Sequence, residues 1–269
     1  MIELENKSYP TIGQSFGILG IIILAAILAS TLFLLKKFID AEALQFIYYL
    51  LTFGVSFWIV YSIRKRKTGE STFNLKIENR QIIPFIVVSA IALLFGVISP
   101  IAELIPMPDF IKDAFLDMAK QSGFFSFLLM VVAAPIFEEL IFRGIILDGL
   151  LKKHSPVTSI LISSIIFGLA HLNPWQFVTA FVIGIFAGWI YYKSRSLSLA
   201  IIIHAVVNLT GYLMRYYGDF DSSSMDKTSI EIYGGILNYA LVIVVSILVI
   251  FGCVYYLNNE FKKNENASS

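Results

Sequence analysis

Residues 15–35 read SFGILGIIILAAILASTLFLL, a run that contains no charged side chain. A helix needs about 18 or more apolar residues to cross the hydrocarbon core of a bilayer. The run is longer than the apolar region of a typical signal peptide, and Glu3 and Glu5 precede it where a signal peptide would be basic. We therefore expect residues 15–35 to form a membrane span.

The rest of the chain repeats this pattern. Of the 269 residues, 57% are hydrophobic and 14% are charged, whereas a soluble domain carries about 25% charged residues. The predicted spans are residues 15–35, 44–63, 82–104, 124–150, 157–172, 175–192, 197–215 and 236–257. The sequence thus predicts an all-α, polytopic membrane helix bundle of about eight transmembrane helices, with residues 1–269 forming one integral membrane domain. A formal net charge of +1 argues against a nucleic-acid partner.

Positive charge in the connections predicts the orientation, because cytoplasmic loops are enriched in Lys and Arg. If the N-terminus is cytoplasmic, 13 of the 20 Lys and Arg residues fall in inner connections and 6 in outer ones, while Arg143 lies within a span. The RKRK run at residues 64–67 is the strongest inner anchor. We therefore expect both termini in the cytoplasm and an even number of spans.

Two connections have their own character. In residues 107–123 one helical face is apolar, which predicts a short helix lying at the outer membrane surface; that face holds Phe110, Ala114, Phe115 and Met118. Residues 217–235 are polar and contain SSS and glycines, so they predict an exposed loop. Gly184 and Gly188 form a GxxxG pair that lets a neighbouring helix approach closely.

Ionisable residues inside a span are costly, at roughly 2.5–3.5 kcal/mol each on insertion scales, and this chain places them selectively. The polar groups within the predicted spans are Glu138, Glu139, Arg143, His171, His204 and Asn208. Each alone would fit a structural role, such as a helix-to-helix hydrogen bond. Together they supply carboxylates, imidazoles, a guanidinium and an amide, a set that can move a proton or hold a metal.

Spacing suggests which of these groups share a helix face. Glu139 and Arg143 are four residues apart and can form an ion pair. Glu138 is rotated by about 100° from that pair and is left without such a partner. His204 and Asn208 also lie four apart, as do Phe167 and His171, so three helices each present a polar face that a bundle can bring together.

Three motifs in this region resemble a known family. EELIFR (138–143), FGLAH (167–171) and HAVVN (204–208) fit the EExxxR, FxxxH and HxxxN patterns of the CPBP family, the CAAX-processing and bacteriocin-processing intramembrane proteases. The resemblance covers residues 124–215, which would form the catalytic core.

The resemblance implies a glutamate-dependent intramembrane endopeptidase, of a type often described as a metalloprotease. By this analogy Glu138 would be the general base that activates water, assisted by His171. His204 and Asn208 would stabilise the oxyanion, and Glu139 with Arg143 would hold the site in shape. These residue types suit peptide hydrolysis, which needs a base and donors aimed at the developing negative charge.

A zinc mechanism is an open alternative. Glu138, His171 and His204 could bind one zinc ion and leave a position for water. The HExxH pair of soluble zinc proteases is absent, however, and three separate helices would have to supply the ligands. The sequence slightly favours a reaction with no metal, so the expected cofactor is either none or zinc.

Other function classes also remain. The chain could be a non-catalytic scaffold or bacteriocin-immunity protein that binds a peptide, or a transporter that relays protons or metal ions. The sequence contains no inverted repeat, which argues against transport. The expected partners are the lipid bilayer and a membrane-anchored peptide or protein substrate, of the prenylated CAAX type or the bacteriocin type. Short connections favour a bacterial plasma membrane; the oligomeric state is not specified.

Overall fold

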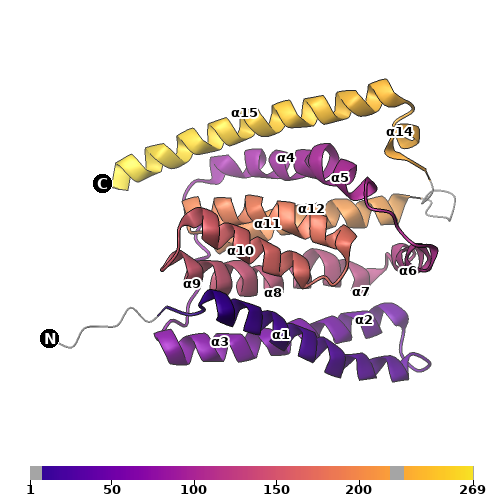
Figure 1. Ribbon diagram of the computed structural model, residues 1–269, viewed down its shortest axis with the longest axis horizontal. Coiled ribbons are helices and arrows are strands. Elements are labelled where there is room, and N and C mark those ends of the chain that lie inside the picture. The colour runs from indigo at the N-terminus through magenta and orange to yellow at the C-terminus, as the bar shows by residue number, and fades with distance from the viewer. Residues whose placement is uncertain (1–7, 219–226, 269) are drawn as a thin grey trace.

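The computed structural model describes residues 8–218 and 227–268, and these two ranges contain helices and loops but no strand. Figure 1 shows the arrangement of the helices. The elements are α1 (Ile12–Ala29), η1 (Ser30–Leu35), α2 (Ala41–Tyr49), η2 (Leu50–Gly54), α3 (Val55–Thr68), η3 (Arg80–Ile82), α4 (Ile83–Leu93), η4 (Leu94–Ile98), α5 (Ser99–Glu103), α6 (Asp109–Ala119), α7 (Phe124–Phe127), η5 (Leu128–Ala133), α8 (Ala134–Ile141), η6 (Phe142–Leu147), α9 (Asp148–Leu151), α10 (Pro156–Leu169), α11 (Pro174–Ser194), α12 (Leu197–Tyr217), α14 (Ser229–Ile232) and α15 (Ile236–Ser268).

The predicted polytopic helix bundle is confirmed. In the described ranges seven helices are long and apolar enough to cross a membrane, and each matches a predicted span. The remaining predicted span, residues 157–172, corresponds to α10, which has 14 residues. At 1.5 Å per residue α10 is about 21 Å long, shorter than the roughly 30 Å hydrocarbon core. The predicted count of about eight therefore comprises seven long helices and one short one.

Several spans contain a π-helical segment in the middle. Two of them, η4 and η5, come shortly before a proline, Pro100 in α5 and Pro135 in α8. A proline inside a helix has no N–H, and its ring collides with the carbonyl four residues earlier. Those carbonyls belong to Gly96 and Val131, which lie inside η4 and η5. The wider π turn thus accommodates the proline without ending the helix.

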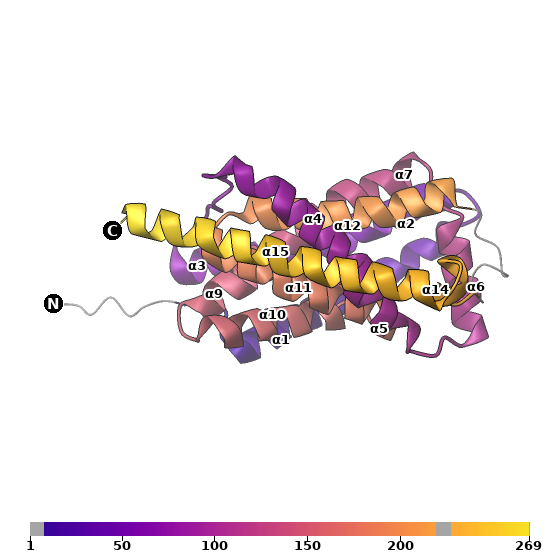
Figure 2. The same ribbon diagram turned by 90° about the horizontal axis from the view of Figure 1, so that it is seen from above.

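The helices form three layers (Figure 1). α1, α2 and α3 make one outer layer, α8 with α10, α11 and α12 the middle layer, and α4, α5 and α15 the other outer layer. Figure 2 shows α15 crossing over α4 and α11. One apolar core joins α4 and α15 to α11 and α12, and a second joins α1 and α3 to η6 and α10. The middle layer therefore has packed helices on both sides.

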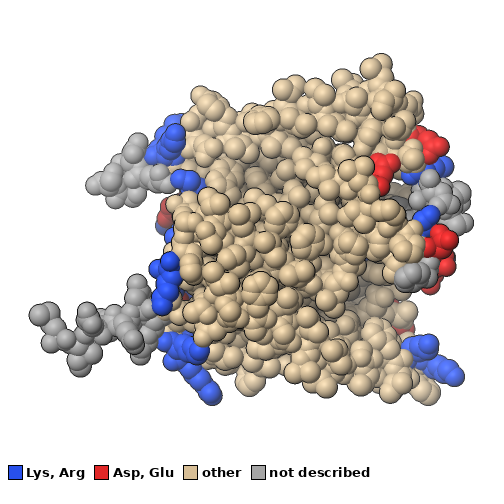
Figure 3. Space-filling model, in the orientation of Figure 1, with Lys and Arg blue, Asp and Glu red and all other residues tan. Residues whose placement is uncertain are grey.

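One end of the bundle is rich in positive charge. The C-terminal ends of α3, α9 and α15 lie at that end (Figure 1), and Lys and Arg gather there in the space-filling view (Figure 3). Arg64 and Lys152 both bind Glu70, at 3.2 and 2.5 Å. Partial burial alone would raise the pKa of Glu70, but the hydrogen bonds and positive charges of Lys152 and Arg64 outweigh it and hold that pKa below its ordinary value.

The two distinctive connections differ in outcome. Within residues 107–123 the predicted helix is α6; the Phe115 ring packs edge-on against Trp175, with centroids 6.0 Å apart, and Met118 lines a cavity. The side chains of Phe110 and Ala114 lie outside the described part. Of the predicted loop at 217–235, residues 219–226 also lie outside it. Residues Ser229–Ile232 form the helix α14, closed by a capping box from Thr228 and Glu231, so the loop prediction was wrong there.

Candidate active site

Glu139 is the centre of a buried polar network in the middle layer. Its side chain is fully buried on α8, and its Oε1 accepts a hydrogen bond of 2.6 Å from Nη1 of Arg143, the pair expected from the spacing. The same oxygen lies 3.0 Å from Nδ1 of His204 on α12. One carboxylate therefore holds two cationic or polar partners from two different helices.

This arrangement fixes the tautomer of His204. An ionised carboxylate can only accept hydrogen bonds, so Nδ1 of His204 must carry the proton that Glu139 accepts. The other ring nitrogen, Nε2, then points toward Glu138, whose Oε2 is 3.9 Å away. Glu139 thus orients the imidazole of His204 so that Nε2 faces the carboxylate of Glu138.

Glu138 is held from the opposite side by a residue that the sequence did not suggest. The hydroxyl of Tyr49, at the end of α2, donates a 3.0 Å hydrogen bond to Oε1 of Glu138. Tyr49 lies 89 residues earlier in the chain, so spacing within a motif cannot reveal the contact. The sequence signal is weak: Tyr49 lies only five residues inside the predicted span 44–63, where a tyrosine also fits an interface anchor.

The ring of Phe167 connects the network to His171. The guanidinium of Arg143 lies over this ring, 4.5 Å from its centroid, and the imidazoles of His171 and His204 pack edge-on at 5.2 and 5.6 Å. Among the described residues, His171 forms no hydrogen bond with Glu138 or His204. The structure therefore brings the two imidazoles to the same aromatic ring but not into direct contact.

His171 is positioned by the end of its own helix. α10 ends at Leu169, and His171 lies in the turn before Asn173, which caps α11 together with Pro174. Nδ1 of His171 is 3.0 Å from the carbonyl oxygen of Phe167. Because a carbonyl only accepts, Nδ1 carries a proton and a neutral His171 leaves Nε2 with a free lone pair.

Asn208 lies one turn beyond His204 on α12, as the spacing predicted. Its Nδ2 donates a 2.8 Å hydrogen bond to the carbonyl oxygen of Met130, within the π segment η5. An amide nitrogen has two hydrogens, so this bond fixes the orientation of Asn208 and leaves one donor for another group.

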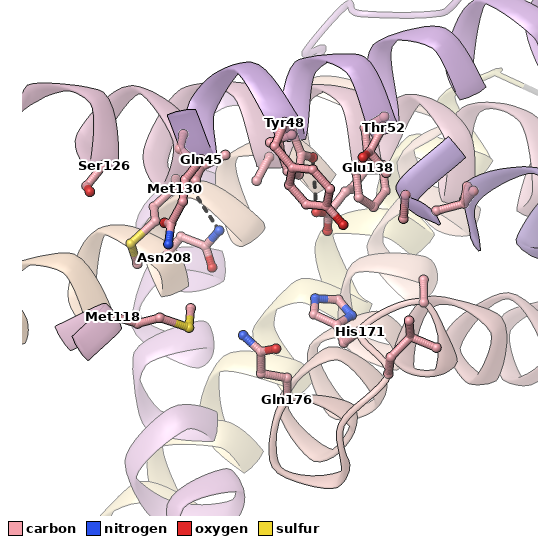
Figure 4. Close-up of a pocket in the computed structure, with 18 of the residues that line it drawn as sticks. Gln45, Tyr48, Thr52, Met118, Ser126, Met130, Glu138, His171, Gln176 and Asn208 are labelled. Atoms are coloured by element: carbon pink, nitrogen blue, oxygen red, sulfur yellow. Dashed lines mark hydrogen bonds between the residues drawn. The ribbon is translucent and has the colours of Figure 1, made fainter. Parts of the chain in front are cut away.

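A cavity of about 350 Å³ brings these side chains together. In Figure 4, Glu138 and His171 lie on opposite sides of it, with Gln176 beside His171 and Asn208 farther along. Its remaining wall is largely apolar and includes Ile22, Ile23, Phe53 and Leu129. The cavity therefore offers a polar centre and an apolar surface to a ligand.

The arrangement does not supply a three-ligand zinc site. In the part of the chain that the structure describes, no three His, Cys, Asp or Glu side chains form a group that could hold a metal ion. Glu138 and His204 approach each other, but His171 is linked to His204 only through the Phe167 ring. The set Glu138, His171 and His204 thus lacks its third ligand at close range.

Close packing against α11 keeps Arg143 in place. A Cβ atom on Gly184 would lie 3.2 Å from Nη2 of Arg143 and 3.0 Å from Cβ of Ser164. From α10, Ser163 also donates a 2.8 Å hydrogen bond to the carbonyl of Phe142, at the start of η6. The first glycine of the GxxxG pair therefore gives the guanidinium its space.

We expect Gly184→Ala to destabilise the protein by about 1–3 kcal/mol, because a side chain there overpacks the contact between α10, α11 and Arg143. Thermal unfolding of the purified protein in detergent measures the effect. Gly20→Ala is the matched control, since Gly20 is exposed and its Cβ would meet nothing within 4 Å. Equal unfolding temperatures for both variants would contradict this packing.

Comparison with known proteins addresses the same region. Residues 120–210 match the model of the family described as Type II CAAX prenyl endopeptidase Rce1-like. The chain is also 30% identical over 84 residues to "Putative membrane peptidase YdiL" of Bacillus subtilis (strain 168), which covers 31% of this chain and 34% of that protein. It thus spans about a third of the length of this curated relative, and no solved structure matches. The resemblance drawn from the three motifs is confirmed over residues 120–210, which are similar to type II CAAX prenyl endopeptidases.

Proposed function

We propose that the protein is an intramembrane endopeptidase that hydrolyses a peptide bond of a membrane-associated substrate, with Glu138 as the general base. The observation that carries this proposal is the 3.9 Å approach of His204 Nε2 to Glu138 Oε2 at the wall of the cavity. The similarity of residues 120–210 to CAAX-type endopeptidases and the integral membrane fold support the general class.

In the proposed first step Glu138 takes a proton from a water molecule, and the resulting hydroxide adds to the carbonyl carbon of the scissile bond. The Tyr49 hydroxyl, bound to Oε1, restricts the carboxylate and leaves Oε2 to accept the proton. The proton then passes to the leaving amine as the carbon–nitrogen bond breaks, so that Glu138 returns to its carboxylate form.

The carbonyl oxygen becomes negative in the tetrahedral intermediate and needs donors in fixed positions. We assign this role to Nε2 of a protonated His204 and to the second hydrogen of Asn208 Nδ2. Glu139 accepts from Nδ1 and so holds the imidazole with Nε2 turned toward Glu138. Met130 holds the amide of Asn208 in place. Glu139 and Arg143 are positioning residues in this scheme.

His171 has a separate task in the proposal. His171 lies across the cavity from Glu138 (Figure 4), and its Nδ1 is bound to the Phe167 carbonyl, so its Nε2 is left to bind the attacking water and share the proton with the carboxylate. His171 lies in a turn beside the Phe167 ring and outside the hydrogen-bond network of Glu139. Replacing His171 should therefore slow the reaction and leave that network intact.

The substrate class follows from the surroundings of the site. An apolar cavity wall within a membrane bundle suits an apolar peptide or one with a lipid chain, which fits a prenylated CAAX-type or a bacteriocin-type substrate. We also propose that the positively charged end of the bundle faces the cytoplasm of a bacterial plasma membrane, in line with the bias in Lys and Arg.

Glu138→Gln should lower kcat for membrane-anchored test peptides by about 10²- to 10⁴-fold, since it removes the base. Tyr49→Phe keeps the base but frees one of its oxygens, and we expect about a tenfold loss. Tyr255→Phe, at an exposed position of α15, is the matched control with unchanged activity. Cleavage by Glu138→Gln at the wild-type rate would refute the mechanism. Peptide binding without cleavage in wild type would instead favour a scaffold.

We further propose that the reaction needs no metal ion, since of the three candidate ligands the described site brings Glu138 and His204 close together without His171. The purified protein should then contain well under one zinc per chain by elemental analysis. Its cleavage rate should also survive dialysis against a chelator. Stoichiometric zinc that disappears in His204→Ala, together with lost activity after chelation, would show that the metal mechanism is correct.

A further inference from the structure

The cavity continues from the Glu138 centre to a second polar group at its other end. Arg215 of α12 lines it there, together with Gln121 and Met118. We propose that Arg215, assisted by Gln121, forms a subsite that binds a carboxylate of the peptide substrate. This inference rests on the proposed function, because it names the part of the substrate that the cavity holds away from the scissile bond.

Arg215 lacks an acidic partner in the described part of the chain. Its side chain is half-buried, and its one hydrogen bond runs from Nη1 to the sulfur of Met130 at 3.2 Å. A thioether sulfur is a weak acceptor and carries no charge. A half-buried guanidinium normally pairs with an anion, so the remaining donors of Arg215 are suited to an anionic ligand.

Glu42, an acidic residue near this end of the cavity, is already engaged. Glu42 of α2 accepts hydrogen bonds from the backbone N–H groups of Gly123, at 2.8 Å, and Ser126, at 3.4 Å. Both amides belong to the start of α7, where unpaired N–H groups attract a carboxylate. Glu42 therefore caps α7 and forms no ion pair with Arg215.

Gln121 provides a second, independent sign of a ligand. Its Oε1 is buried in the cavity wall and has no hydrogen-bond donor among the described residues. The neighbouring Ser122 is fixed to α12, because its carbonyl accepts a 2.6 Å hydrogen bond from the hydroxyl of Tyr212. A peptide that places its carboxylate on Arg215 can offer a backbone N–H to Gln121.

The spacing along α12 sets the length of peptide between the two ends. His204, Asn208 and Arg215 all line the cavity, and at 100° per residue positions 204 and 215 lie within about 20° of each other around the helix. Arg215 lies about 10 Å beyond Asn208 and about 16 Å beyond His204. An extended chain covers about 3.3 Å per residue, so the carboxylate lies about three to five residues from the scissile bond.

The subsite can be tested by binding alone. The full chain carrying Glu138→Gln, which cannot turn the peptide over in our scheme, is reconstituted in phosphatidylcholine nanodiscs. The probes are fluorophore-labelled pools of apolar octapeptides in three forms: a free C-terminal carboxylate, a C-terminal carboxamide, and a carboxamide terminus with one internal Asp. Fluorescence anisotropy gives an apparent Kd for each pool.

We expect a carboxylate-bearing pool to bind about 10- to 100-fold more tightly than the neutral carboxamide pool, the range of a hydrogen bond to a charged group. Arg215→Gln should remove this difference, and Arg215→Lys should keep part of it. Lys120→Gln is the control, because Lys120 is an exposed cation at the same end, paired with Asp117 at 3.7 Å. Its variant should bind as the parent does.

The three peptide pools distinguish the possible ligands of Arg215. A preference for the free terminus alone identifies the substrate's C-terminus, and an equal preference for the Asp pool identifies an acidic side chain; both support the subsite. Equal binding of all pools, or an equal loss for charged and neutral pools in Arg215→Gln, would overturn it. Wild-type cleavage is assayed separately, so failure of the proposed reaction leaves this result interpretable.

Discussion

The fold of the middle layer depends on one shared oxygen. Oε1 of Glu139 accepts from Arg143 and from His204, and all three side chains are buried within the bundle. A lone buried charge would be very unfavourable in this setting, and removing one partner of such a network costs about 3–5 kcal/mol. The need to satisfy Glu139 therefore fixes how α8, η6 and α12 meet. It also draws in α10, through the Phe167 ring under Arg143.

Two adjacent glutamates acquire different tasks from this constraint. Glu139 points into the protein, where its Oε1 accepts from Arg143 and His204. Glu138, about 100° around the helix, lines the cavity with one oxygen held by Tyr49. Glu139 positions His204, and His204 presents its Nε2 to Glu138. The proposed base and its neighbour are thus coupled through the imidazole of His204.

The membrane spans and the Glu139–Arg143 pair could be predicted from the sequence because both depend on residues close together in the chain. Uninterrupted apolar runs predict spans, and a four-residue spacing predicts the contact between Glu139 and Arg143. The contacts of Tyr49 with Glu138 and of Met130 with Asn208 join distant segments and follow only from helix packing. The π segment η5 ahead of Pro135 is likewise a feature that neither apolar runs nor four-residue spacings indicate.

The structure also explains how the imidazoles of His171 and His204 are placed relative to each other. His171 lies about 22 Å along from the start of α10, and His204 about 10 Å from the start of α12, so the two imidazoles lie at different depths along their helices. They do not meet: the Phe167 ring, one turn nearer the start of α10, lies between them. Because of this difference in depth, His171 and His204 line the same cavity at separate positions.

The most direct test of this account is the tautomer of His204. The chain contains three histidines, so solid-state NMR of protein labelled with ¹⁵N-histidine can be assigned by removing His154 and His171 in turn. The account predicts a His204 Nδ1 that carries a hydrogen-bonded proton, and a Glu139→Gln variant in which its signal shifts. A His204 protonated only at Nε2, and unaffected by Glu139→Gln, would contradict it.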